Sequence, residues 1–247
     1  MGDSKSGKTG ALASLVLAGY KLRILDFDNG LDILATIIRN ADPKKLENVE
    51  FRTLRDKYIS TPNGPIVGTA TAFIEGIKLL DRWKYGDTDL GVPAEWGPDI
   101  IVVVDSLTFL SDSAWNFREP LVPRSRDGKY DIRAVYKDAQ DAISGVLALL
   151  TSENFRTNVI VISHVRYVDN PDGTKKGYPT SVGAALSPEI PRYFNSVALT
   201  QTGPGGKRFI QTTATAMIDL ANPASFKMLP TLPIETGLAT FFSTLRS

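Results

Sequence analysis

The sequence predicts an α/β fold, in which a mostly parallel sheet is flanked by helices and carries an antiparallel hairpin toward its C-terminal end. Two apolar, β-branched runs at residues 100–104 and 159–162 are typical of parallel strands that are buried on both faces. Helical spacing of apolar residues alternates with strand-like runs along the chain. Residues 196–202 and 207–213 flank a Gly-Pro-Gly-Gly turn, which is the pattern of a hairpin.

The remaining elements follow from local spacing and from stop signals. The sequence predicts helices at 9–18 (ended by Gly19), 31–38, 70–83 and 132–150, and further strands at 22–27 and 48–54. Because no internal repeat, low-complexity tract or linker interrupts this alternation, we expect one domain over residues 1–247.

Composition excludes several classes of protein. Lys and Arg together number 28 against 27 Asp and Glu, so any binding to nucleic acid must be local. There are no cysteines and a single histidine, His164, which argues against disulfides, thiol chemistry and a zinc site. No apolar run approaches the roughly 18 residues of a membrane helix, and the N-terminal residues are unlike a signal peptide. We therefore expect a soluble, cytoplasmic protein with no membrane partner.

The most specific motif lies at the start of the chain. Residues 2–9 match G-x-x-x-x-G-K-[S/T] at every fixed position, and an expected helix follows, so this segment is a candidate P-loop for ATP. Lys8 would reach the β- and γ-phosphates, and the Thr9 hydroxyl would coordinate Mg²⁺. The alternative is an ordinary Gly-rich turn. The candidate phosphate-binding residues are Gly2, Asp3, Ser4, Lys5, Ser6, Gly7, Lys8 and Thr9.

A candidate metal-binding carboxylate follows the apolar strand at 100–104. Asp105 stands at the point where a P-loop enzyme places the acid that holds Mg²⁺, either directly or through water. Taken alone, such an aspartate is more often a loop residue or a helix cap. Its distance from the P-loop motif favours the metal-binding role.

One expected element is absent from the sequence. A P-loop normally follows a β-strand, yet only Met1 precedes Gly2. We expect this strand to lie between two others, one of them ending at Asp105. Either the chain is truncated, or its start is wrongly assigned, or another segment pairs there instead. Residues 239–243 are the candidate for such a segment.

An acidic cluster at residues 24–32 (ILDFDNGLD) refines the class. The chain here resembles the RecA-type recombinase core, and more closely the small phage recombination ATPases that act with single-strand annealing proteins. Asp26, Asp28, Leu31 and Asp32 fall at the offsets of that family's pattern. The resemblance implies that Asp28 replaces the water-activating glutamate, with a side chain one methylene shorter. The alternative is that Asp28 only forms a turn or caps the next helix.

The resemblance continues further along the chain. Asp105-Ser106 matches the end of the family's Walker B strand, and residues 161–166 (VISHVR) match the strand that ends in the γ-phosphate sensor. His164 stands at the sensor position, although a lone histidine is more often structural. The polar stretch at 167–182 resembles a mobile DNA-binding loop, and residues 183–186 (GAAL) match the segment after it.

The resemblance also implies binding to single-stranded DNA. A first DNA-binding loop is expected within residues 117–133 and a second one after His164. Tyr167 and Tyr178 are candidates for stacking on bases. The candidate DNA-binding residues are Arg124, Arg126, Lys129, Arg166, Lys175 and Lys176.

The function implied is a Mg²⁺-dependent, DNA-stimulated ATPase of recombination or annealing. Lys8, Asp28, Asp105 and His164 would form its catalytic set. ATP would lie between protomers of a filament or ring, with Lys207, Arg208 and Lys227 as candidates for a basic residue given to the neighbour. A single-strand annealing or single-strand-binding protein is an implied partner, in a bacterial host cytoplasm if the chain is phage-encoded. Two alternatives remain: a RecA-fold motor or signalling ATPase, and a nucleotide-gated or inactive DNA-binding accessory protein.

Overall fold

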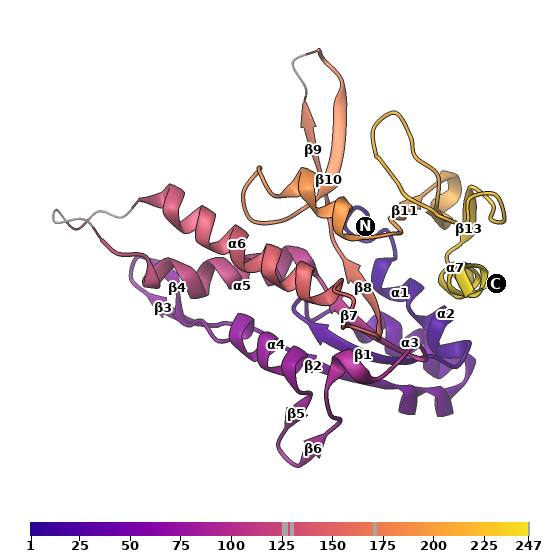
Figure 1. Cartoon of the computed structure of the whole chain (residues 1–247), viewed down its shortest axis with the longest axis horizontal. Coiled ribbons are helices and arrows are strands. Elements are labelled where there is room, and N and C mark those ends of the chain that lie inside the picture. Colours follow the sequence, from indigo (N-terminus) through magenta and orange to yellow (C-terminus); the bar gives the residue numbers. More distant parts are fainter. Residues whose placement is uncertain (125–127, 129–130, 170–171, 247) are drawn as a thin grey trace.

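The computed structural model describes residues 1–124, 128, 131–169 and 172–246 (Figure 1). Its centre is a four-stranded parallel sheet with the strand order β2-β1-β7-β8. The strands are β1 (Lys21–Asp26), β2 (Val49–Thr53), β7 (Ile100–Asp105) and β8 (Asn158–Ile162). The predicted α/β class with a parallel sheet is therefore confirmed.

The register of the sheet brings the carboxyl ends of three strands together. Asp26 of β1 lies opposite Asp105 of β7, and Asp105 lies opposite Ile162 of β8. Ligand sites of open α/β sheets lie at this edge. The segment that follows β8, with Ser163 and His164, therefore reaches the same edge as the two aspartates.

Helices cover both faces of the sheet, because successive apolar side chains of its strands point to opposite faces and both sets are buried. Leu22 and Ile24 of β1 pack with α2 (Ala13–Leu17) and α3 (Asp32–Ala41), and α1 (Lys8–Ala11) precedes α2. Val102 and Val104 of β7 pack on the other face. The helices on that face are α4 (Ala72–Asp81), α5 (Leu107–Arg118) and α6 (Ile132–Leu150).

The C-terminal part adds the predicted antiparallel strands. β11 (Leu199–Thr202) pairs with β12 (Arg208–Gln211), and β12 also pairs with a third strand, β13 (Thr231–Pro233). The chain then ends in α7 (Gly237–Arg246), so the suggestion that residues 239–243 form a strand is wrong. Phe241 of α7 is buried against β12 and β13, which explains why this segment is an amphipathic helix.

Three further segments depart from the prediction. The stretch expected to be a mobile loop forms a hairpin of β9 (Val165–Asp169) and β10 (Lys175–Pro179). A second hairpin, β3 (Lys57–Thr61) with β4 (Gly64–Thr69), precedes α4, and a short one, β5 (Lys84–Tyr85) with β6 (Thr88–Asp89), follows it. Short 3-10 turns join other elements at 43–48, 93–95, 119–121, 187–193 and 204–206. Within the described ranges, no helix is long and apolar enough to cross a bilayer.

The place of the strand expected before Gly2 also differs from the prediction. β7 has β1 on one side and β8 on the other, so no further strand fits beside β7. Gly2 instead lies beyond β8, because its N–H donates to the carbonyl of Ser163 at 3.1 Å. A strand leading into Gly2 would therefore follow the outer edge of β8.

Candidate nucleotide-binding site

The P-loop is a tight turn that is tied to β11. Lys5 and Gly7 adopt positive φ angles of 63° and 96°. A Cβ atom on Gly7 would come within 2.9 Å of Cδ of Arg208, so that glycine is required by both its angle and its surroundings. The hydroxyls of Ser6 and Thr200 lie 2.6 Å apart in a buried hydrogen bond. This hydrogen bond to β11 stabilises the conformation of the P-loop.

Lys8 points back across the loop. Its Nζ donates to the carbonyls of Gly2 at 2.9 Å and Asp3 at 2.7 Å, and it lies 3.4 Å from Nδ1 of His164. Burial lowers the pKa of Lys8, while the negative charges of Asp105, Asp28 and Asp3 oppose that shift. The structure thus brings the lysine, the histidine and the charges of the aspartates to one place.

Thr9 and Asp105 are in direct contact. The Thr9 hydroxyl donates to Oδ2 of Asp105 at 2.7 Å. Burial raises the pKa of Asp105 to about 6, and the bond from Thr9 acts in the opposite direction because it favours the charged carboxylate. A hydroxyl and a carboxylate at this separation form a set of hard oxygen ligands.

Asp26 and Asp28 have different surroundings. Asp26 is buried, accepts from the backbone N–H groups of Asn29 at 2.7 Å and Gly30 at 3.4 Å, and accepts from the Thr53 hydroxyl at 2.9 Å. Burial raises the pKa of Asp26, against these hydrogen bonds. Asp26 therefore stabilises the turn after β1. Asp28, in contrast, is half-buried, and its negative charge acts to raise the pKa of Lys8 and that of His164.

His164 lies where β8 reaches the P-loop. Its backbone N–H donates to the Thr108 hydroxyl at 3.2 Å, and its ring packs edge-on to Phe109 with 6.4 Å between centroids. Burial lowers the pKa of His164, and the charge of Lys8 lowers it further, so the ring is neutral near pH 7. A neutral Nδ1 facing the Lys8 ammonium is an acceptor, which places the ring proton on Nε2.

The comparison with known families agrees with this geometry. A family model described as an AAA domain matches residues 1–220. The chain belongs to the AAA domain family. No protein of curated function matches it. The match covers the P-loop, the parallel sheet and the β9–β10 hairpin, and it ends before β13 and α7.

Membership of the AAA domain family implies nucleotide binding, usually with Mg²⁺, and the residues present fit both. Lys8 supplies a cation for phosphates, and Thr9 with Asp105 supplies oxygens for Mg²⁺. The hydroxyl of Ser106, next to Asp105, is buried and has no hydrogen-bond partner within the part of the chain that the structure describes. A buried hydroxyl without a partner, next to a carboxylate, is suited to bind an ordered water or to act as a further oxygen ligand of the ion.

The AAA domain site includes three residues whose role the sequence did not show. Thr108 bonds to His164, and Arg55 donates to the carbonyls of Phe27 at 3.1 Å and Asp28 at 3.4 Å. Arg208, considered above for a neighbour's site, lies against Gly7 of its own P-loop. A signal for Arg55 in the sequence is its place as a basic residue just after the end of the expected strand 48–54.

The candidate DNA-binding residues do not meet in one place. Arg126 and Lys129 lie outside the described residues, and the ends of α5 and α6 that flank their segment are far from the β9–β10 hairpin (Figure 1). Arg124 belongs to the α5–α6 connection, whereas Arg166, Lys175 and Lys176 belong to the hairpin.

On the hairpin, both candidate lysines have acidic partners. Lys175 lies 3.5 Å from Asp169, and Lys176 lies 2.8 Å from Asp219. The register pairs Tyr178 with Arg166 and Gly177 with Tyr167, so the two tyrosines face opposite sides of the ribbon.

Proposed function

We propose that this chain is a Mg²⁺-dependent ATPase that binds single-stranded DNA and assists recombination or strand annealing. The observation that carries the ATPase part is the contact between Thr9 and Asp105, with Lys8 beside them. Three strand ends and the P-loop converge there, at the edge of the sheet where nucleotides bind in α/β proteins.

In this proposal each residue has a distinct task. Lys8 binds the β- and γ-phosphate oxygens of the substrate, and the P-loop N–H groups orient them. Mg²⁺, when bound, neutralises charge on the same phosphates. Thr9 and Asp105 would hold that ion, one of them directly and the other directly or through a water.

The hydrolytic step requires an oriented water. Asp28 is the proposed base, because its half-buried carboxylate acts electrostatically on both Lys8 and His164, whereas Asp26 is occupied by the turn. His164, neutral and in contact with Lys8, is proposed to report the γ-phosphate to the β9–β10 hairpin that begins at the next residue.

The DNA-binding part rests on the resemblance to the phage recombination ATPases and on the position of the hairpin. The β9–β10 ribbon projects from the body next to the P-loop (Figure 1). The same resemblance supports the proposal that the substrate binds between protomers of a filament or ring, and that an annealing or single-strand-binding protein is the partner.

A second candidate function is a RecA-fold ATPase that acts on something other than DNA. The ion pairs of Lys175 and Lys176 favour it, because a lysine held by a carboxylate has less charge available for phosphates. Measuring ATP turnover with and without single-stranded DNA separates the two functions. Stimulation by DNA that is lost in Lys8→Ala supports recombination or annealing, and turnover indifferent to DNA supports the second function. No turnover in either condition would contradict both.

A further inference from the structure

Arg55 lies shortly after β2, at the edge of the sheet where the strand-end aspartates meet. The chain here runs alongside the turn after β1, because the Leu54 N–H donates to the carbonyl of Asp26 at 2.8 Å. A side chain continues this pairing. Nη1 of Arg55 donates to the carbonyls of Phe27 at 3.1 Å and Asp28 at 3.4 Å. The guanidinium therefore binds the backbone of the turn that carries the proposed base of hydrolysis.

The backbone of Asp28 is held on two sides. Its N–H donates to the carbonyl of Asp105 at 3.2 Å, and its own carbonyl accepts from Arg55. The first bond joins the turn to β7, and the second joins it to the segment after β2. Because both the donor and the acceptor of this residue are fixed, the side chain leaves the backbone in a defined direction. These two bonds therefore decide where the Asp28 carboxylate lies.

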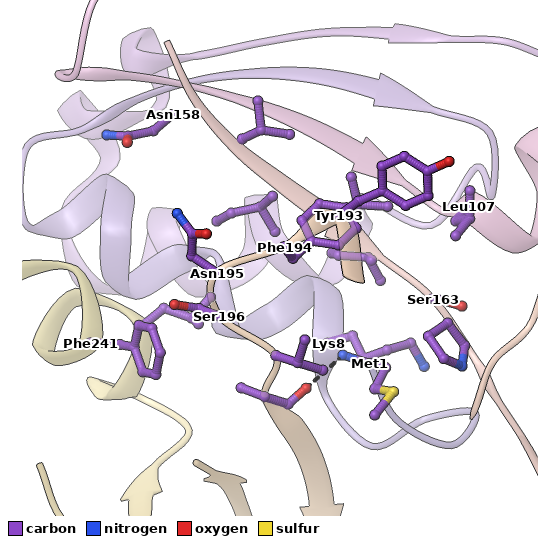
Figure 2. A pocket seen from close by; sticks show the side chains of 18 of the residues that line it. Met1, Lys8, Leu107, Asn158, Ser163, Tyr193, Phe194, Asn195, Ser196 and Phe241 are labelled. Carbon is purple, nitrogen blue, oxygen red and sulfur yellow. Dashed lines mark hydrogen bonds between the residues drawn. The ribbon is translucent and has the colours of Figure 1, made fainter. Parts of the chain in front are cut away.

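The guanidinium of Arg55 is also held from the side of α5. Its Cζ lies over the Phe109 ring, 5.7 Å from the centroid, and Phe109 packs edge-on with His164. His164 in turn lies 3.4 Å from Nζ of Lys8, and Figure 2 shows Lys8 near Ser163, the residue before His164. Arginine suits this position better than lysine, because its planar group can lie over a ring and donate to carbonyls at the same time.

The alternative is an ordinary surface contact, since Arg55 is exposed. What distinguishes Arg55 is the residue that it holds. The negative charge of Asp28 acts on both Lys8 and His164, so this carboxylate lies beside the proposed phosphate site. A side chain that binds the backbone of the same residue therefore affects the geometry of the site as well as the stability of the turn.

We propose that Arg55 is the positioning residue of the hydrolytic step, because it fixes the turn after β1 in the conformation in which the Asp28 carboxylate orients the attacking water. Arg55 acts through Asp28 and does not itself touch the reacting atoms. The inference rests on the proposed ATPase function. A displacement of about 1 Å can cost on the order of a hundredfold in rate, so loss of Arg55 should slow turnover while the P-loop still binds the nucleotide.

The first test is Arg55→Ala, with Arg39→Ala, another exposed arginine, on α3, as the matched control. We expect Arg55→Ala to lower kcat by roughly 10- to 100-fold and to leave ATP affinity within about twofold of the control. A kcat equal to that of Arg39→Ala would overturn the proposal. A higher KM with unchanged kcat would mean that Arg55 binds the nucleotide, and would overturn it as well.

A double-mutant cycle tests whether Arg55 acts through Asp28. If it does, adding Arg55→Ala to Asp28→Asn should slow turnover by no more than about twofold, because the group that Arg55 positions is already lost. Single-turnover measurements with excess protein give the low residual rates. Two losses that multiply would mean that Arg55 acts directly on the phosphates or the metal, and would overturn the positioning role.

Hydrogen exchange separates this inference from the proposed function. The amides of Asn29 and Gly30, which donate to Asp26, should exchange faster in Arg55→Ala than in Arg39→Ala, whether or not ATP is hydrolysed. Equal exchange would show that Arg55 does not hold the turn, and would overturn the proposal. Faster exchange in a protein whose wild-type form hydrolyses no ATP would confirm the contact with the turn and overturn the proposed function, together with the role of Arg55 in hydrolysis.

Discussion

The hydroxyl of Thr9 donates a 2.7 Å hydrogen bond to Oδ2 of Asp105 and so joins the P-loop to the end of β7. The two residues are 96 positions apart in the chain. Because Asp105 is buried, this hydroxyl is one of the few groups that favour its charged form. The same two oxygens are those expected to hold Mg²⁺, which makes the pair the most direct place to test metal dependence.

Replacing Thr9 by valine should remove most of the effect of Mg²⁺ on nucleotide binding. Valine keeps the shape of threonine but has no hydroxyl, and a hydrogen bond to a charged group is worth about 1.5–3 kcal/mol, or roughly 10- to 100-fold in affinity. Thr9→Ser, the control, should stay close to wild type. ATP affinity measured with Mg²⁺ and with EDTA checks this, and an unchanged Mg²⁺ effect in Thr9→Val would remove Thr9 from the metal site.

Lys8→Ala should abolish measurable ATP binding, because Lys8 is the ammonium group enclosed by the loop. Lys21→Ala, an exposed residue at the far end of β1, is the matched control. Nucleotide affinity by calorimetry, with circular dichroism to verify folding, gives the readout. Wild-type-like affinity in a folded Lys8→Ala protein would contradict the P-loop assignment.

Asp28→Asn should leave ATP binding intact and slow hydrolysis by a factor on the order of a hundred or more, as expected for loss of a general base. Asp26→Asn should behave differently. It weakens the bonds to Asn29, Gly30 and Thr53, so it should lower the free energy of unfolding. Turnover and thermal unfolding of both variants separate the roles. Turnover within a few-fold of wild type in Asp28→Asn would reduce that residue to part of the turn.

The β9–β10 hairpin should contribute to DNA binding through its lysines. Neutralising Lys175 and Lys176 together should weaken binding to all single strands alike and reduce the salt slope by up to about two phosphate contacts. Conversely, Asp219→Asn frees Lys176 from its 2.8 Å ion pair and should strengthen binding. Fluorescence anisotropy at several salt concentrations measures both effects. Unchanged binding after also replacing Tyr167 and Tyr178 would direct attention to the segment between Arg118 and Arg133.

The strongly periodic parts of the fold could be predicted from sequence, and the parts decided by tertiary contact could not. The helix at Ile132–Leu150 matches its predicted range, and the strand at Ile100–Asp105 is one residue longer than predicted, because apolar spacing alone specifies both elements. The sequence predicts a loop where the β9–β10 ribbon lies, because the stretch 167–182 is polar and contains Gly and Pro; in the structure β9 is mostly exposed, whereas β10 has two buried residues. α7 contains β-favouring Thr and Phe residues, and burial of Phe241 overrides their propensity.

The sequence indicates the candidate site residues more completely than their surroundings. The P-loop motif and the strand-end acids predict Lys8, Thr9 and Asp105, because such chemistry depends on fixed spacing, and the structure brings these three side chains together. Arg208 was connected with a neighbour's site because no local pattern shows that β12 brings it back to Gly7. Strand order is likewise a long-range property. The sequence therefore predicts the strand leading into Gly2 beside β7, whereas among the described strands it is β8 that lies at the edge of the parallel sheet.

The stability of the 247-residue chain should depend on pH through the Met1 amine. Its pKa falls from 8.0 in the unfolded chain to about 5 when buried, with Lys8 as the charged group acting on it. Above pH 8 the amine is neutral in both states and contributes no pH dependence. As the pH falls from 8 toward 5, only the unfolded chain takes up the proton, so the free energy of unfolding should decrease, by up to about 4 kcal/mol.

Nα-acetylation isolates this effect, since the acetylated nitrogen keeps an N–H for Ala198 and cannot be protonated. His164, whose pKa is also lowered, shifts stability in the same direction in both forms. The difference between the two unfolding free energies therefore reports Met1 alone. Urea unfolding from pH 5.5 to 8.5 should give curves that converge above pH 8 and separate below it, with the acetylated chain more stable. An equal pH dependence of the two chains would mean that the amine is solvated, and that Met1 is not held against Ala198.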